Sequence, residues 1–223
     1  MEKDTLIAFD FDGTLYPIDP YDSEQLLMLA CSAKKGTLNR KRTKLAVRQD
    51  QKGNMDWAAF TASYRLHTKS CNEDLIQSVT KALLGKVHPA DFEALRQLSS
   101  RSDFAIISCG TENLVEAFLQ ALGISDLFIG IWGKRLHFSE DRKTSMEIHV
   151  KGPQDKARVL DALGKDYART IAIGDGPTDI PMLQSADLGL IVDWKGKGNS
   201  YPFETFSSLD DACRKANLFI NGA

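Results

Sequence analysis

Short apolar runs alternate with helical patterns over much of the chain. Each run holds a few consecutive aliphatic residues between charged or turn-forming residues, which is typical of a strand buried on both faces of a parallel sheet. These runs occupy residues 6–9, 104–111, 170–176 and 187–193. Helical patterns follow the second and third runs, one between Thr111 as N-cap and Gly123 as C-terminal stop, the other starting at Pro177. This alternation predicts an α/β fold with a Rossmann-like parallel sheet.

Between Tyr16 and about His88 the pattern is helical only. Amphipathic segments separated by short Gly, Asn or Ser punctuation occupy residues 22–33, 39–51, 55–68 and 72–84. A segment of this length is too long for a loop, so we expect a small helical bundle inserted after the first strand and lying over its end. The predicted domains are therefore a core, residues 1–16 and 89–223, and a helical domain, residues 17–88.

The rest of the predicted core is less regular. Residues 88–100 predict a helix that returns to the core, with Pro89 in its first turn. Apolar clusters at residues 127–132, 136–138 and 146–150 predict a strand followed by a β-hairpin. The C-terminal residues predict a strand, a loop and a helix that close the sheet.

Composition and charge exclude several classes of protein. The 223 residues are 43% hydrophobic and 26% charged, with a formal net charge of -2, as in ordinary soluble globular chains. This charge suggests neither nucleic acid nor a membrane as a partner, and the basic run from Lys34 to Lys44 is interpreted as a solvated face. The cysteines are widely spaced without a CxxC pair, which predicts reduced thiols and no zinc site. With no signal-type segment and no apolar stretch near the roughly 18 residues of a membrane span, we expect a cytoplasmic protein.

Polar residues stand where the predicted strands end. Asp10 and Asp12 close the first strand, Ser108 lies near the end of the second, and Asp175 follows the third, with Asp179 four residues later. In an open parallel sheet these strand ends share one edge, where ligands bind. Clustered carboxylates need a cation, and oxygen ligands without His or Cys nearby select Mg²⁺. Glycines beside these positions let backbone N–H groups approach an anion, so the sequence predicts a metal and a phosphate at this edge.

The stretch "DFDGTL" from Asp10 to Leu15 resembles the first motif of the haloacid dehalogenase superfamily of phosphatases and phosphotransferases. Matches to its other motifs follow in order: Ser108 in "IISCGT", Lys156 in "GPQDKARVL", and the acidic "GDGPTD". The helical insertion resembles the first type of cap in that superfamily. The stretch "GDGPTDIPMLQSADLGLIV" is most similar to its phosphoserine phosphatase-like branch.

The resemblance implies a role for each matching residue. Asp10 would be the nucleophile that forms an aspartyl-phosphate, and Asp12 the general acid and then base. Lys156 would neutralise charge on the nucleophile and the phosphate. Phosphoryl oxygens would be held by Ser108 and the backbone near Cys109 and Gly110, and the Cys109 thiol itself is interpreted as structural. The implied metal site draws on Asp10, Asp12, Asp175 and Asp179, with the last as an outer or water-mediated group.

The substrate-binding residues depart from the phosphoserine phosphatase pattern. Asp19 stands where those enzymes carry a glutamate, and His67 where they carry an arginine, with Arg65 two residues earlier. Thr178 replaces an asparagine of the fourth motif. We therefore expect a small phosphomonoester as substrate, with Asp19, Arg65 and His67 as cap contacts, and make no prediction of phosphoserine.

The predicted function is a Mg²⁺-dependent phosphomonoester hydrolase acting on a small phosphorylated metabolite. Two alternatives stay open: a phosphotransferase or phosphomutase with the same chemistry, and a non-catalytic protein that binds a phosphorylated ligand. We expect neither nucleic-acid nor membrane partners, and a monomer or homodimer.

Overall fold

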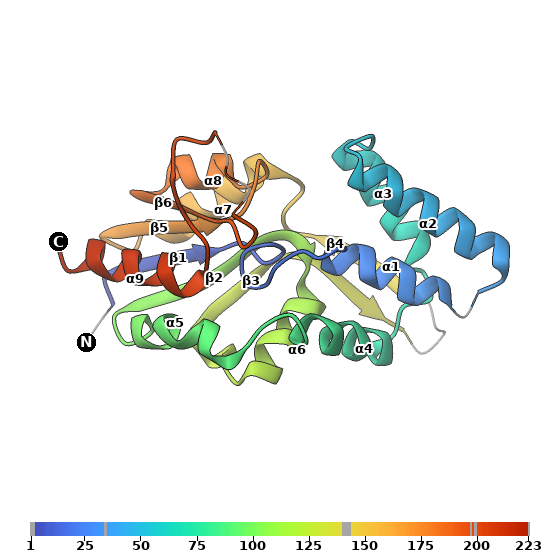
Figure 1. The fold of residues 1–223 in the computed structure, drawn as a ribbon, viewed down its shortest axis with the longest axis horizontal. Helices are drawn as coiled ribbons and strands as arrows, with labels where there is room; N and C mark the ends of the chain where they lie inside the picture. Colours follow the sequence, from blue (N-terminus) through green and yellow to red (C-terminus); the bar gives the residue numbers. More distant parts are fainter. Residues whose placement is uncertain (1–2, 34, 140–143, 197, 199, 223) are drawn as a thin grey trace.

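The computed structural model describes residues 3–33, 35–139, 144–196, 198 and 200–222. Its strands form one sheet in the order β4-β3-β2-β1-β5-β6-β7 (Figure 1). The strands are β1 (Thr5–Phe9), β2 (Ser102–Thr111), β3 (Phe128–Phe138), β4 (Thr144–Ile148), β5 (Arg169–Gly174), β6 (Leu188–Val192) and β7 (Glu204–Phe206). The helices are α1 (Ser23–Ala33), α2 (Thr37–Gln51), α3 (Trp57–His67), α4 (Glu73–Leu84), α5 (Glu93–Leu98), α6 (Glu112–Leu122), α7 (Pro153–Gly164), α8 (Ile180–Ser185) and α9 (Leu209–Ile220), with short 3-10 turns at Pro89–Phe92 and Ser125–Leu127.

The sheet is parallel except where β3 pairs with β4. The chain adds β2 and β3 on one side of β1, and then β5, β6 and β7 on the other. The strand order therefore reverses between β1 and β5, and a crevice opens beyond the C-terminal ends of these two strands. The predicted α/β, Rossmann-like sheet with a helical cap inserted after its first strand is confirmed.

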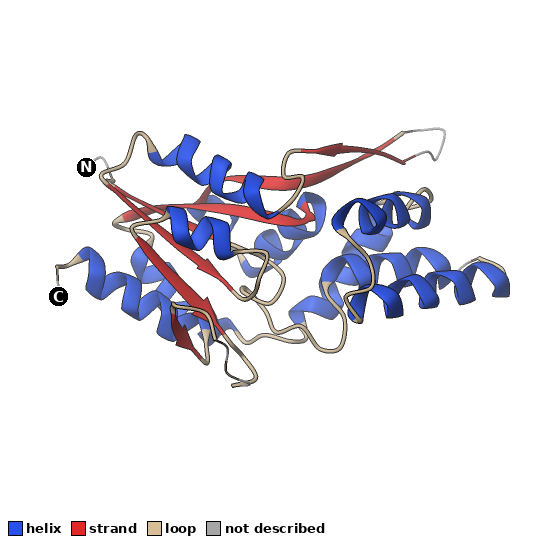
Figure 2. Cartoon of the chain, turned by 90° about the horizontal axis from the view of Figure 1, so that it is seen from above, coloured by secondary structure: helices blue, strands red, loops and turns tan. Residues whose placement is uncertain are grey.

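Helices cover both faces of the sheet, which explains why the central strands are apolar throughout. In β1, Leu6 and Ala8 belong to one buried cluster, while Ile7 and Phe9 belong to the other. Because successive side chains of a strand point to opposite faces, both sets must be apolar. Helices α7 and α8 lie on one face, and α5, α6 and α9 lie on the other (Figures 1 and 2).

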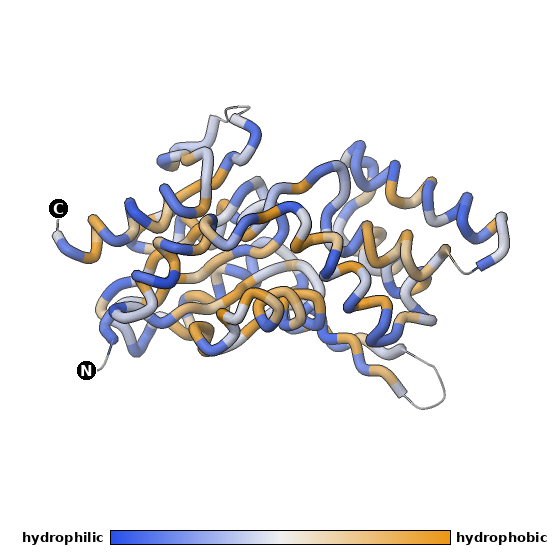
Figure 3. The backbone as a smooth tube through the Cα atoms, turned by 60° about the horizontal axis from the view of Figure 1, so that its bottom comes forward, coloured by the Kyte–Doolittle hydropathy of each residue, from blue (hydrophilic) through white to orange (hydrophobic). Residues whose placement is uncertain are grey.

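Helices α1 to α4 form the cap, at the end of the molecule away from both termini (Figure 1). Apolar cap residues such as Leu27, Tyr64 and Leu83 join the same hydrophobic cluster as Phe9 of the sheet, so the cap packs directly on the core. Helix α2 is mostly hydrophilic, whereas hydrophobic positions collect along the central strands (Figure 3). The described lysines and arginines of α2 are exposed, as predicted for the basic run; Lys34 lies outside the described residues.

Local signals set several element boundaries. Thr111 is the N-cap of α6, and Gly123 ends that helix in the left-handed region at φ 63°, both as predicted. The helix predicted over 88–100 begins with a 3-10 turn at Pro89 and continues as α5. No helix among the described residues is long and apolar enough to cross a bilayer.

One predicted boundary was wrong. The apolar clusters at 127–132 and 136–138 do not form separate strands but lie in one strand, β3, whose first half pairs with β2 and whose second half pairs with β4. The charged pair between the clusters looks like a break, yet Lys134 contacts Glu24 and Arg135 contacts Glu112, so both bases are accommodated inside the strand. Residues 140–143, between the two hairpin strands, lie outside the described residues.

Candidate active site

Asp10 lies at the switch point of the sheet. It follows the last residue of β1, its side chain is almost fully buried, and its N–H donates to the Ile173 carbonyl at 2.9 Å. Lys156, from the first turns of α7, donates through Nζ to Asp10 Oδ1 and to Asp179 Oδ1, both at 2.5 Å. A buried lysine thus bridges two buried carboxylates that come from opposite sides of the switch point.

The electrostatics of this group follow from burial and crowding. Burial, and then the neighbouring Asp179 carboxylate, raise the pKa of Asp10 from 3.8 to about 7. Burial and the same neighbour raise the pKa of Asp175 well above its usual value. Burial by itself would lower the pKa of Lys156, but the carboxylates of Asp10 and Asp179 outweigh it and raise that pKa. One lysine balances only part of the negative charge.

The donor set fits a hard cation. Oxygens of Asp10, Asp175 and Asp179 all lie within 4.8 Å of one another. In the described part of the chain, no hydrogen bond is made to the Asp175 carboxylate, so its oxygens are available as ligands. Asp179 Oδ2 accepts the N–H groups of Asp175 and Gly176 at 2.9 and 3.1 Å, which holds the loop after β5 in place. Three carboxylates without a nitrogen or sulfur donor are the set that Mg²⁺ prefers.

Two glycines make this approach of carboxylates possible. Gly13 has φ +82°, and a Cβ there would lie 2.1 Å from Asp175 Oδ2. A Cβ on Gly174 would lie 2.5 Å from the Cβ of Asp179. Any side chain at either position would push a carboxylate out of the cluster.

Asp12 is held by the start of the cap. Its Oδ1 accepts the Ser23 N–H at 2.7 Å and also the Tyr16 hydroxyl, while its Oδ2 accepts the Ser23 hydroxyl at 2.9 Å. Ser23 is the first residue of α1, so the orientation of this carboxylate depends on where the first cap helix begins. Asp12 is not part of the group of three carboxylates described above, and its predicted role as a metal ligand stays a prediction.

The end of β2 forms the opposite side of the crevice. Ser108 is buried, and its Oγ accepts the Gly110 N–H at 3.0 Å. A Cβ on Gly110 would lie 2.9 Å from Asp12 Oδ2, so this loop and Asp12 are close neighbours. Burial raises the pKa of the Cys109 thiol to about 12, which agrees with a structural thiol rather than a nucleophile.

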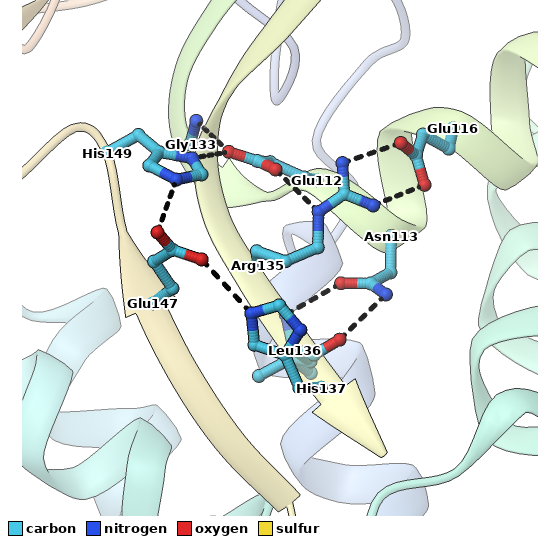
Figure 4. Close-up of polar contacts among 9 residues, drawn as sticks. All are labelled: Glu112, Asn113, Glu116, Gly133, Arg135, Leu136, His137, Glu147 and His149. Carbon is cyan, nitrogen blue, oxygen red and sulfur yellow. Dashed lines mark hydrogen bonds and ion pairs between the residues drawn. The ribbon is translucent and has the colours of Figure 1, made fainter.

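Contacts from the β3–β4 hairpin anchor the turn from β2 into α6 (Figure 4). Glu112 accepts the Gly133 N–H at 2.7 Å and contacts His149 Nδ1 at 2.6 Å. Its other oxygen accepts Arg135 Nε at 2.7 Å, and the same guanidinium forms a two-pronged pair with Glu116. The end of β2, which carries Ser108 and Gly110, is therefore fixed where it enters α6.

The crevice opens into a cavity of about 510 Å³ between the core and the cap. We call its core side the floor, which consists of Asp10, Asp12, Ser108, Lys156 and Asp175. We call its cap side the wall, which consists of Asp22, Glu24, Asp50, Asp56, Trp57 and Phe60. The structure thus brings together in one cavity the floor residues that lie as far apart in the sequence as positions 10 and 175.

The wall rests on a buried network that sequence analysis missed. Lys134 Nζ donates to Glu24 Oε2 at 2.5 Å and lies 4.5 Å from the centre of the Trp57 ring. The Thr111 hydroxyl donates to Glu24 Oε1 at 2.8 Å and meets the Tyr64 hydroxyl at 2.6 Å. No spacing in the sequence links these residues, since they come from α1, α3, β3 and the end of β2. The only signal is the charge of Lys134, which follows a run of apolar residues in β3.

The predicted cap contacts lie away from this cavity. Asp19 is 72% exposed at its side chain and pairs with Lys195 at 3.5 Å. Arg65 is exposed, because on α3 the residues that face inward are Phe60 and Tyr64, and Arg65 is rotated away from both. The ring of His67 contacts Thr43 Oγ1 of α2 at 2.9 Å. None of the three is among the residues that line the cavity.

Comparisons with known proteins agree with the geometry. A sequence profile described as haloacid dehalogenase-like hydrolase matches residues 7–184. A phosphoserine phosphatase of Halobacterium salinarum is 29% identical over 211 residues, covering 92% of this chain and 94% of that protein. A 2-hydroxy-3-keto-5-methylthiopentenyl-1-phosphate phosphatase of Microcystis aeruginosa is 34% identical over 106 residues, covering 46% of this chain and 49% of that protein. A solved substrate-bound phosphoserine phosphatase complex has a TM-score of 0.69 at 18% identity, covering 99% of each chain, which is a likeness of fold.

Proposed function

The chain belongs to the haloacid dehalogenase-like hydrolases and is similar to phosphoserine phosphatases, and on this premise we propose that it hydrolyses a small phosphomonoester through an aspartyl-phosphate on Asp10. The observation that carries the proposal is the buried group of Asp10, Lys156 and Asp179 at the switch point, with Asp175 beside it. The same proposal divides the chain into a core, residues 1–16 and 89–223, and a cap, residues 17–88.

In the first step, a carboxylate oxygen of Asp10 attacks the phosphorus atom and the bond from phosphorus to the ester oxygen breaks. Asp12 gives its proton to the leaving oxygen, which departs as an alcohol. The Ser108 hydroxyl and the N–H groups near Gly110 hold the phosphoryl oxygens. Lys156 keeps Asp10 oriented through the 2.5 Å hydrogen bond and offsets its negative charge.

In the second step, water attacks the phosphorus of the aspartyl-phosphate. Asp12, now deprotonated, takes the proton from that water, and the bond between phosphorus and the Asp10 oxygen breaks. Inorganic phosphate leaves and Asp10 returns to its carboxylate form. The hydrogen bonds from Ser23 and Tyr16 keep Asp12 near the reacting oxygens in both steps.

Asp10, Asp175 and Asp179 would hold Mg²⁺, with Asp179 serving chiefly through Lys156 and the loop amides. When bound, Mg²⁺ supplies the positive charge that reduces repulsion between a carboxylate nucleophile and a phosphate dianion. The raised pKa values of Asp10 and Asp175 support this assignment, because carboxylates crowded without a cation resist ionisation.

The proposal is tested by phosphate release from nitrophenyl phosphate with Mg²⁺ and with EDTA, and by acid-quenching the enzyme during turnover of a radiolabelled phosphomonoester. We expect release only with Mg²⁺, and protein-bound label that hydroxylamine removes, as for an acyl phosphate. Label that withstands hydroxylamine would contradict a role for Asp10 as nucleophile. Adding alcohol acceptors to the same assay distinguishes phosphate transfer from hydrolysis.

A further inference from the structure

We propose that the substrate's leaving alcohol carries a cationic amine and no carboxylate, so that the enzyme acts on a phosphorylated amino alcohol whose ammonium group binds the wall. This inference rests on the proposed function, because it assumes that a phosphate ester occupies the floor. It is carried by the charges that line the cavity, by one orphaned buried oxygen, and by the aromatic rings beside them.

Three carboxylates of the wall lack a directly paired cation among the described residues. Within the described residues, Asp22, Asp50 and Asp56 form no ion pair. The hydrogen bonds that these carboxylates accept from described residues come from neutral groups, namely the Gln25 N–H, the Gln25 side-chain amide and the Ala59 N–H, each at 2.7 Å. Glu24 differs, since Lys134 already neutralises it.

The pKa of Asp22 agrees with this imbalance. Burial, and then the nearby Asp12 carboxylate, raise the pKa of Asp22 well above its usual value. A carboxylate in this setting gains from a cation that enters the cavity.

Gln25 provides an independent sign of a missing donor. Its side chain is 5% exposed, and its Nε2 donates to Asp50 at 2.7 Å, yet its Oε1 has no hydrogen-bond partner among the described residues. Gln25 lines the hollow next to the cavity, and that hollow shares Asp22 and Asp50 with the wall. A buried hydrogen-bond acceptor without a donor lowers the stability of the fold. The carboxylates of Asp22 and Asp50, which line the same hollow, can likewise only accept hydrogen bonds. An ammonium group, which only donates, satisfies such a set.

The arrangement suits an organic cation rather than a second metal ion. Among the described acidic, histidine and cysteine side chains, the only group close enough to hold a metal is that of Asp10, Asp175 and Asp179. Asp22 and Asp50 belong to no such group. Trp57 and Phe60 add apolar ring surface at the same place, which suits the carbon chain of an alkylammonium group, while the Lys134 ammonium already lies 4.5 and 5.4 Å from the centres of these rings.

A substrate carboxylate would meet no free cation. Lys156 is the only lysine, arginine or histidine among the described residues that line the cavity, and it is already bound to Asp10 and Asp179. Arg65 and His67 lie elsewhere, as described above. The cavity therefore favours an amine and disfavours the additional carboxylate that phosphoserine has.

The test compares three esters that differ in one group each, with the purified full chain and Mg²⁺. Ethanolamine phosphate carries the amine, propyl phosphate is its uncharged counterpart, and phosphoserine adds a carboxylate. We expect kcat/KM for ethanolamine phosphate to exceed that for each of the others by about tenfold or more, as one partly buried charge interaction allows. Equal values for ethanolamine and propyl phosphates, or a preference for phosphoserine, would overturn the inference.

Variants locate the source of the preference. Asp50→Asn and Asp22→Asn should each reduce the ratio of kcat/KM for ethanolamine phosphate to that for propyl phosphate, and Asp126→Asn, at an exposed site outside the cavity, should keep it. An unchanged ratio in both wall variants, each checked for folding by thermal unfolding, would overturn the role of the wall. Failure to hydrolyse any ester, nitrophenyl phosphate included, would instead overturn the proposed function and this inference with it.

Discussion

The floor and the wall face each other across one cavity and are both acidic, but their charges are balanced in different ways. On the floor, Lys156 bridges Asp10 and Asp179 within the fold, and the donor set provides for a metal. On the wall, Lys134 balances Glu24, while the hydrogen-bond donors to Asp22 and Asp50 in the described part of the chain are neutral. The floor is thus equipped for phosphate and the wall for whatever the phosphate is attached to.

The two regions also differ in how the chain builds them. Apart from Lys156, which lies in the first turns of α7, the floor residues stand near the ends of the neighbouring parallel strands or in the turns that follow, so the sheet brings them together. Wall residues come from the start of α1 and the residue before it, from the C-terminal end of α2, and from α3 and the residue before it. The reaction at the floor therefore depends on the sheet, and the choice of substrate depends on how the cap helices pack.

The largest effect is expected on the floor. Asp10→Asn keeps the size of the side chain but removes the nucleophile, so kcat should fall by roughly 10⁴-fold or more. Phosphate release measures the loss, and circular dichroism confirms the fold. Asp4→Asn, at an exposed position just before the same strand, is the matched control and should keep full activity. Turnover in Asp10→Asn near that of the control would mean that another group attacks the phosphorus.

A large effect on stability is expected behind the wall. Lys134→Met leaves Glu24 buried without its cation, which should lower the free energy of unfolding by about 3–5 kcal/mol. Urea unfolding near neutral pH measures the change. The double variant Lys134→Met with Glu24→Gln should recover most of the loss, because no buried charge is left unpaired. If the double variant were as unstable as Lys134→Met, the cost would come from packing on Trp57 and Phe60 instead.

A smaller, pH-dependent change in the free energy of unfolding should distinguish the metal-free protein from the protein with Mg²⁺. The pKa of Asp10 is raised from 3.8 to about 7, so folding of the metal-free protein binds a proton within that window. Stability should therefore fall as the pH rises from about 4 to about 7, by on the order of 1–3 kcal/mol. Urea unfolding in EDTA measures the slope, which should be shallower in Asp10→Asn and offset in the wild type by added Mg²⁺. A stability that rises over this range in EDTA would contradict the assignment.

A fall in kcat of about tenfold is expected for a substitution at the contact between the cap and Asp12 of the floor. Ser23→Ala removes the hydroxyl that donates to Asp12 Oδ2 and leaves the backbone N–H in place, so kcat should fall about tenfold, as for loss of one hydrogen bond to a charged group. Steady-state kinetics with separate kcat and KM values measure this. Ser32→Ala, a buried serine of the same helix that bonds the Leu29 carbonyl, is the control. Equal kinetics in the two variants would show that Ser23 does not position Asp12.

The smallest effect is expected at Arg65. Its exposed position on α3 predicts that Arg65→Ala changes kcat/KM by less than about twofold, as for ordinary surface substitutions. The same ester panel measures it. A large rise in KM would show that Arg65 reaches the cavity during turnover, and the wall would then include a cation.

Much of the core follows from the sequence because its signals are local. The apolar run ending at Asp10 is a strand because Ile7 and Phe9 face one cluster while Leu6 and Ala8 face the other. Gly123 stops α6 because its φ of 63° suits glycine. The extent of β3 was predicted wrongly because its signals are not local. Lys134 and Arg135 interrupt the apolar pattern, and the partners that accommodate their charges, Glu24 and Glu112, are distant in the sequence.

The sequence by itself determined the fold class and placed Asp10, Asp12, Ser108 and Asp175 at one edge of the sheet, because parallel strands place their C-terminal ends at one edge whatever else the chain does. Lys156 was expected from the family resemblance instead. Only the tertiary structure decided which cap side chains face the cavity. Asp19, Arg65 and His67 were expected from their positions relative to the phosphoserine phosphatase pattern, whereas the wall is formed by Asp22, Asp50 and other residues that packing turns inward. The direction of a side chain on a packed helix depends on contacts between distant elements, and no local pattern records them.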